Sequence, residues 1–184
     1  MFYSKIVNLF SQANGFHFAR WNKAISPIVF GVDDDTLKSI RATFSDVLSL
    51  TSVSLSDLDP EFGANFIIFF CSEWSELESV PNLCKMVPNL RKLVIKLEKG
   101  NANQYRTFSF TSSGSIKLCI LIIRYDHFQA SVSVQTLSMS QILKSLLLWS
   151  PQAFAYESPI IKASDSCPSE FKPFYAALLK ASYD

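Results

Sequence analysis

The most apolar stretch of the chain lies late in the sequence, over residues 136–149. Its large apolar side chains recur at spacings of three and four, at Leu137, Ile142, Leu143, Leu146 and Trp149. This periodicity places them on one face of a helix. A capping-box pattern, Ser138-x-x-Gln141, favours a helix start, and Pro151 stops the helix. The run is far shorter than the roughly 20 residues that a bilayer span requires, so we predict a buried core helix over residues 136–149.

Apolar runs elsewhere predict the strands of a sheet. Residues 25–32 and 65–71 have strand length, and the second run is typical of a strand covered on both faces. Between them, Asp33 opens an amphipathic helix, because carboxylates favour the positive N-terminal end of a helix. This order predicts a right-handed parallel crossover. Residues 105–110 and 116–124 flank a Ser-Gly turn and predict a hairpin.

Helical patterns fill the remaining segments. Further helices are expected within residues 1–15, where Asn14-Gly15 forms the stop, and over residues 73–80 and 88–98. Residues 152–184 hold an irregular stretch and then a closing helix. The sequence therefore predicts one α+β domain over residues 1–184, with about four strands in a mixed sheet packed against helices.

Composition and charge narrow the class of protein. Hydrophobic residues make up 48% of the chain and charged residues 18%, as in a folded domain. With 17 basic and 16 acidic residues the net charge is near zero. The chain has no run of basic residues of the kind that binds nucleic acid. No membrane partner is indicated either. Low net charge combined with high hydrophobicity favours a protein partner or self-association, for example as a homodimer.

The residue types that carry catalysis lack the spacing that catalysis requires. The two histidines, His17 and His127, have no neighbouring ligand at metal-binding spacing. The four cysteines form no C-x-x-C pair, so neither a redox motif nor a zinc knuckle is suggested. Residues 1–14 lack the basic start and uninterrupted apolar run of a signal peptide, so we expect a cytoplasmic protein with reduced thiols. No G-x-S-x-G motif occurs, and the five glycines are too isolated to form a phosphate loop. We therefore predict no catalytic residue, no metal site and no cofactor.

One polar group could bind a small ligand. Arg106, Arg124, Asp126 and His127 fall at the same end of the predicted hairpin, just before the core helix. We call these four residues the arginine end. They could line a small cleft for an anionic ligand. The alternative is an arginine paired with Asp126 at the end of a sheet, since exposed ion pairs are common.

A second candidate is an interaction surface near the N-terminus. Phe16, Phe18, Arg20 and Trp21 lie in an alternating aromatic and basic segment that could be an extended arm. Aromatic and arginine residues are enriched at protein interfaces. Packing of these aromatics onto the sheet explains the pattern equally well.

Several segments resemble an uncharacterised bacterial family related to zincin-type metalloproteases. The resembling residues are Arg20-Trp21-Asn22-Lys23 leading into Ile28-Val29-Phe30, the long helix after Asp33, Ala64-Asn65, and Ser140 to Leu148. The last segment matches the position of the family's active-site helix. The resemblance covers roughly residues 20 to 150, a domain-sized stretch, and implies a zincin-like order of elements around the core helix.

The chain departs from the zincin pattern at the active-site helix. In zincins this helix carries His-Glu-x-x-His, whose histidines hold zinc and whose glutamate is the base. Ser140, Gln141 and Lys144 stand at the corresponding positions, and Lys144 would repel a cation. The resemblance thus implies a non-catalytic binding or assembly domain on a degenerate zincin-like scaffold. The alternative is a small-ligand-binding protein or a hydrolytic enzyme that uses the arginine end.

Overall fold

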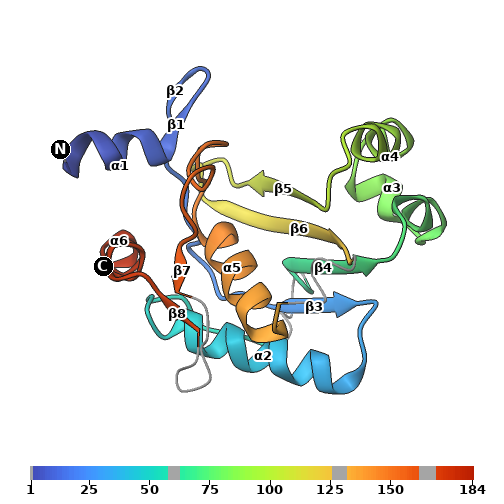
Figure 1. The fold of residues 1–184 in the computed structure, drawn as a ribbon, viewed down its shortest axis with the longest axis horizontal. Coiled ribbons are helices and arrows are strands. Elements are labelled where there is room, and N and C mark those ends of the chain that lie inside the picture. The colour runs from blue at the N-terminus through green and yellow to red at the C-terminus, as the bar shows by residue number, and fades with distance from the viewer. Residues whose placement is uncertain (1, 58–62, 126–131, 162–168) are drawn as a thin grey trace.

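A four-stranded mixed sheet forms the centre of the molecule (Figure 1). The computed structural model describes residues 2–57, 63–125, 132–161 and 169–184. The strands follow the order β3-β4-β6-β5, with bounds β3 Pro27–Phe30, β4 Phe66–Cys71, β6 Ile116–Arg124 and β5 Gln104–Phe110. β3, β4 and β6 are parallel, and β5 pairs antiparallel with β6. The predicted α+β class, the parallel pairing of the first two strands and the hairpin are therefore confirmed.

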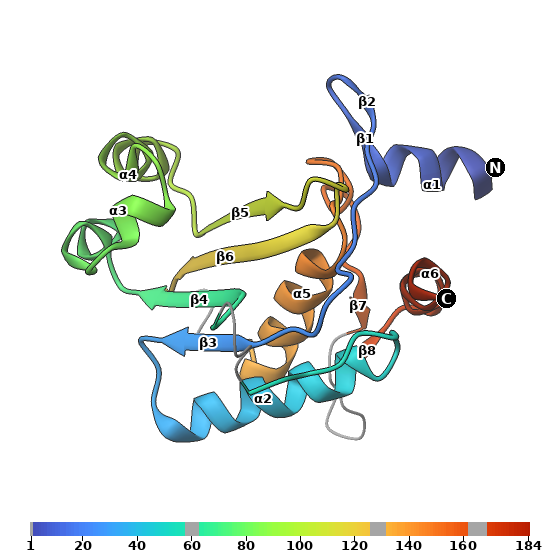
Figure 2. The same ribbon diagram turned by 180° about the vertical axis from the view of Figure 1, so that it is seen from behind.

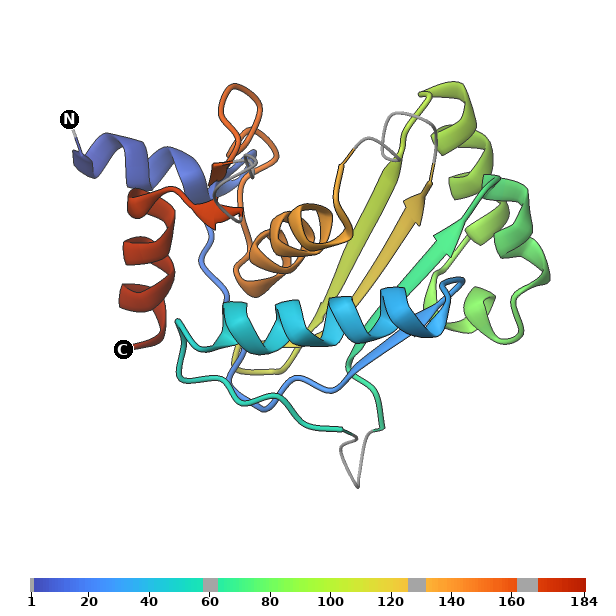
Figure 3. The same cartoon turned by 60° about the horizontal axis from the view of Figure 1, so that its bottom comes forward.

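Two long helices, α2 (Asp34–Leu48) and α5 (Val134–Leu146), cover one face of the sheet, which we call the first face (Figure 3). Asp33 caps α2 as predicted, because its Oδ1 accepts the Thr36 N–H at 2.7 Å. The largest core cluster lies between these helices and the sheet. α2 and α5 thus cover the first face.

Three short helices pack on the opposite face, which we call the second face. They are η1 (Trp74–Ser79), α3 (Leu83–Met86) and α4 (Leu90–Lys99). The side chains of alternate strand residues form a smaller second cluster with them, at Ile67, Phe69, Ile120 and Ile122. β3 has little cover on this face, since the Phe30 side chain remains 45% exposed.

The two ends of the chain meet beside the first face. α1 (Phe2–Phe10) is followed by the short hairpin of β1 (Ser11–Gln12) and β2 (Gly15–Phe16). The small pair of β7 (Ile160–Ile161) and β8 (Glu170–Phe171) precedes α6 (Pro173–Tyr183). Figure 2 shows α1 and α6 at the same end of the molecule. The Lys5 ammonium joins them, 4.3 Å from the centre of the Phe174 ring.

Several predicted boundaries were wrong because tertiary pairing ends helices earlier than local sequence does. The core helix starts after its N-cap Ser133 and ends at Leu146, not at Trp149. Leu147 is extended and bridges Arg20, so it leaves the helix. The N-terminal helix likewise ends at Phe10, before Asn14-Gly15. Residues 74–79 form a 3-10 helix, and α3 was not predicted. In the part of the chain that the structure describes, no helix has the length and apolarity to cross a membrane.

Candidate functional site

Arg106, the first residue of the arginine end, is enclosed between β5 and α5. Its Nε donates to Ser145 Oγ at 2.8 Å, and its Nη2 donates to Gln141 Oε1 at 2.5 Å. Gln141 in turn donates from Nε2 to Gln104 Oε1 at 2.7 Å. Burial lowers the pKa of the Arg106 guanidinium. Arg106 therefore joins a strand to a helix through neutral partners.

Arg124, the second arginine of the arginine end, does not join Arg106. In the hairpin, Arg106 pairs with Leu121, whose side chain lies on the first face of the sheet. Arg124 lies three residues further along β6 than Leu121. Because side chains alternate along a strand, Arg124 points to the second face, where its Nη2 donates to Asn101 Oδ1 at 3.0 Å. The structure thus places the two arginines on opposite faces. Asp126 and His127 lie outside the described residues, and ligand binding at this end stays a prediction.

The aromatic segment near the N-terminus divides between surface and core. Phe16 and Phe18 are exposed, and both rings pack edge-on against Phe10. Arg20 donates from Nη1 to the Ser182 carbonyl oxygen and lies over the Tyr183 ring. Trp21 differs from the expectation of an interface residue, since it is only 2% exposed. Its Nε1 donates to the Ser145 carbonyl oxygen at 2.9 Å, because a buried indole needs an acceptor.

The residues for which the sequence suggested a zincin-like position, Gln141 and Lys144, are held by other side chains of the chain. Gln141 is buried and held by Arg106. The Lys144 ammonium lies 5.4 Å from the centre of the Phe154 ring. Burial, and then the nearby charge of Arg106, lower the pKa of Lys144. Among the residues that the structure describes, no three His, Cys, Asp or Glu side chains gather into a possible metal site.

The two strand cysteines behave as buried apolar groups. Burial raises the pKa of both the Cys71 and the Cys119 thiols to about 11. A thiol with such a pKa stays protonated near neutral pH and is a poor nucleophile. Cys84 is exposed on α3, and all three are free thiols. The cysteines described here thus supply no reactive thiolate at the sheet.

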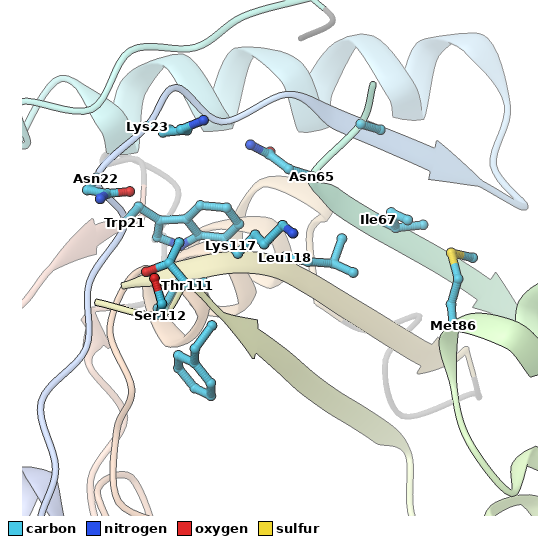
Figure 4. Close-up of a pocket in the computed structure, with 13 residues that line it drawn as sticks. Trp21, Asn22, Lys23, Asn65, Ile67, Met86, Thr111, Ser112, Lys117 and Leu118 are labelled. Carbon is cyan, nitrogen blue, oxygen red and sulfur yellow. The ribbon is translucent and has the colours of Figure 1, made fainter. Parts of the chain in front are cut away.

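A pocket opens on the second face, at the end where β4 begins (Figure 4). Its volume is about 590 Å³. Ile67, Leu118 and Met86 form its apolar part, while Lys23 and Lys117 lie at the end nearer Trp21 (Figure 4). The pocket therefore combines an apolar floor with a basic end.

A second pocket, of about 690 Å³, continues along the same face toward the end of β4. The two pockets share Ala64, Ile67 and Met86, so together they form one groove. Its far part is lined by Phe30, whose ring stacks on that of Phe69 with centres 5.0 Å apart. We call the continuous feature the β3–β4 groove.

The groove follows from how the sequence covers the second face. η1 and α3 span only 74–79 and 83–86, and with α4 they pack on β4 and β6. At the end of β3, Gly31 has a φ of +83°, and a Cβ there would collide with the Phe70 carbonyl oxygen. Glycine thus lets the chain turn tightly into α2 on the first face. On the second face, β3 is left without a covering helix.

The residues of the β3–β4 groove were not identified from the sequence. Phe30, Met86, Lys23, Asn65 and Lys117 come from separate segments with no common motif. The available signal was the pair of short helical patterns after β4, which are too short to cover four strands.

Comparison of the chain with protein-family models, with curated proteins and with solved structures finds no match.

Proposed function

We propose that this chain is a non-catalytic binding domain, on a degenerate zincin-like scaffold, that docks a segment of a protein partner in the β3–β4 groove. The observation that carries the proposal is the groove itself. It is a continuous apolar surface on a sheet whose opposite face is covered by α2 and α5. Exposed apolar patches of this kind mark interaction sites.

The exposure of the groove favours a protein segment over a small molecule. Small-molecule pockets bury most of their ligand's surface. Here the large apolar residues along the groove stay open to solvent, with exposed fractions of 45% for Phe30, 39% for Met86 and 43% for Phe110. A shallow surface of this shape suits an extended chain that covers these side chains as it binds.

The non-catalytic part of the proposal rests on the side chains of α5. Gln141 and Lys144 lie at the positions that resemble a zincin motif. The Gln141 side chain accepts a hydrogen bond from Arg106, and the Lys144 ammonium lies over the Phe154 ring. The order of elements from β3 to α5, with α5 beside α2 on the first face, supports the scaffold part of the proposal. The cytoplasmic location remains a prediction.

The test is a selection of random nine-residue peptides, displayed on phage, against the full chain. The groove variant is F30E/M86E. The matched control is I95E/I161E, because Ile95 and Ile161 are exposed to a similar degree, 44% and 50%. Peptides selected on the wild type should bind F30E/M86E at least about tenfold more weakly, since a carboxylate in an apolar contact is costly to desolvate.

The control variant should bind the selected peptides as the wild type does. Circular dichroism and urea unfolding would establish that both double variants are folded. Equal binding by F30E/M86E and the wild type would contradict the proposal, as would the absence of any enriched peptide. Native mass spectrometry of the wild type would identify a second copy as the occupant if a dimer formed and the groove variant abolished it.

A further inference from the structure

The β3–β4 groove carries opposite charges at its two ends. Lys23 and Lys117, both exposed, lie at the end where β4 begins. Glu76, also exposed, lines the end where β4 finishes. The Glu76 carboxylate is held in place because its Oε1 accepts the backbone N–H groups of Ser72 and Glu73, at 3.2 and 2.9 Å. Lys23 and Lys117 each make a further interaction within the chain.

We propose that the occupant of the groove is an extended apolar peptide segment with an acidic residue at one end and a basic residue at the other. This inference rests on the proposed function and specifies the partner's chemistry. The acidic end lies against Lys23 and Lys117, and the basic end lies against Glu76. Complementary charges at the two ends fix the direction in which a segment binds.

The length of β4 sets the length of the segment. β4 spans Phe66–Cys71, which is six residues. At about 3.3 Å per residue, a strand of this length extends for roughly 20 Å. An extended partner segment of about six residues therefore reaches from the lysine end to Glu76. Its alternate side chains contact Ile67, Met86 and Phe30 in turn.

Side chains, more than the edge of β3, hold the segment. The Ser26 carbonyl oxygen accepts the Phe66 N–H, so it faces β4. The alternation of a parallel ladder then turns the backbone groups of Ile28 and Phe30 toward β4 and those of Pro27 and Val29 outward. Proline has no N–H, so Val29 alone within β3 offers an outward donor. The edge supports few backbone bonds, and specificity comes from the groove.

The test uses the same nine-residue peptide library with charge variants of the full chain. K23E/K117E reverses the basic end, and Glu76→Gln removes the acidic charge while keeping an acceptor for the N–H groups. K96E/K180E is the matched control, because both of its lysines are exposed outside the groove and the net charge changes equally. Dodecanoate serves as a probe for a small amphipathic anion.

Peptides selected on the wild type should be apolar, with Asp or Glu at one end. They should bind K23E/K117E about tenfold more weakly than the wild type or K96E/K180E. Glu76→Gln should weaken binding less and remove the preference for Lys or Arg at the other end. Selection on K23E/K117E should yield peptides with a basic residue in place of the acidic one.

Three results would overturn this inference. One is that wild type and K23E/K117E select the same peptides; the docking function would then stand if F30E/M86E still failed to bind them. Another is tight dodecanoate binding that K23E/K117E abolishes and that displaces the peptides, which would make the ligand lipid-like. The third is a dimer that F30E/M86E dissociates, which would make the occupant a second copy of the chain.

Discussion

The two faces of the central sheet differ in how completely they are covered. On the first face, α2 and α5 form a continuous layer in which Phe44, Leu143 and Leu146 are fully buried. On the second face, three shorter helices pack over β4 and β6 and leave β3 open. The difference teaches that both faces have a buried core, but only the second face leaves a large aromatic side chain of the sheet, Phe30, open to solvent.

The largest expected effect is on the closed face. Phe44 packs edge-on against Phe66, with ring centres 5.0 Å apart. Phe44→Ala should lower the free energy of unfolding by about 3–5 kcal/mol, because it leaves a cavity in a packed core. Met86→Ala, in the groove, should lower it by less than about 1 kcal/mol. Urea denaturation of both variants measures the contrast, and equal losses would mean that the two faces contribute alike.

A smaller effect is expected for the polar contact within the closed face. Arg106→Met leaves Gln141 Oε1 without its donor, which should cost about 1–3 kcal/mol of unfolding free energy. R106M/Q141L removes both partners and should recover most of that loss, since apolar replacements of buried charged groups are often neutral. Urea unfolding checks the pair. A double variant less stable than Arg106→Met would show that the guanidinium does more than satisfy Gln141 and Ser145.

The extent to which the sequence predicts the fold depends on how local the determining interactions are. α2 is predicted well because Asp33 and the apolar stripe that follows act within one helix. The end of α5 is not, because Leu147 pairs with Arg20 from the other end of the chain. Whether Arg106 and Arg124 share a site depends on strand alternation in the paired hairpin. Because both arginines lie at one end of the hairpin, their position in the sequence did not show that their side chains point to opposite faces of the sheet.

The β3–β4 groove could not be predicted from the sequence for a related reason. An open surface arises from what neighbouring segments fail to cover, and no local pattern records that. Phe30 looks like an ordinary core residue of a strand, and Met86 lies in α3, which was not predicted. Trp21 illustrates the converse, because its aromatic and basic neighbours resemble an interface while its own indole is buried against Phe66.

An effect confined to alkaline solution is expected from the buried thiol of the first face. Burial raises the pKa of Cys119 from 9.0 to about 11, so the folded chain keeps a proton that the unfolded chain releases. The associated stability is complete below pH 9 and is lost as the pH rises through about 11. Cys119→Ala should therefore lose less stability over this range than the wild type, by urea unfolding at several pH values. An unchanged slope in Cys119→Ala would refute the assignment.

The most direct test of the open second face is carbene footprinting with mass spectrometry, with and without a selected peptide. This method labels exposed side chains. The account predicts that the peptide reduces labelling of Phe30 and Met86 and leaves Ile95 and Ile161 unchanged. Reduced labelling at Ile95 or Ile161, with Phe30 and Met86 still labelled as in the free chain, would contradict it and place the binding surface elsewhere.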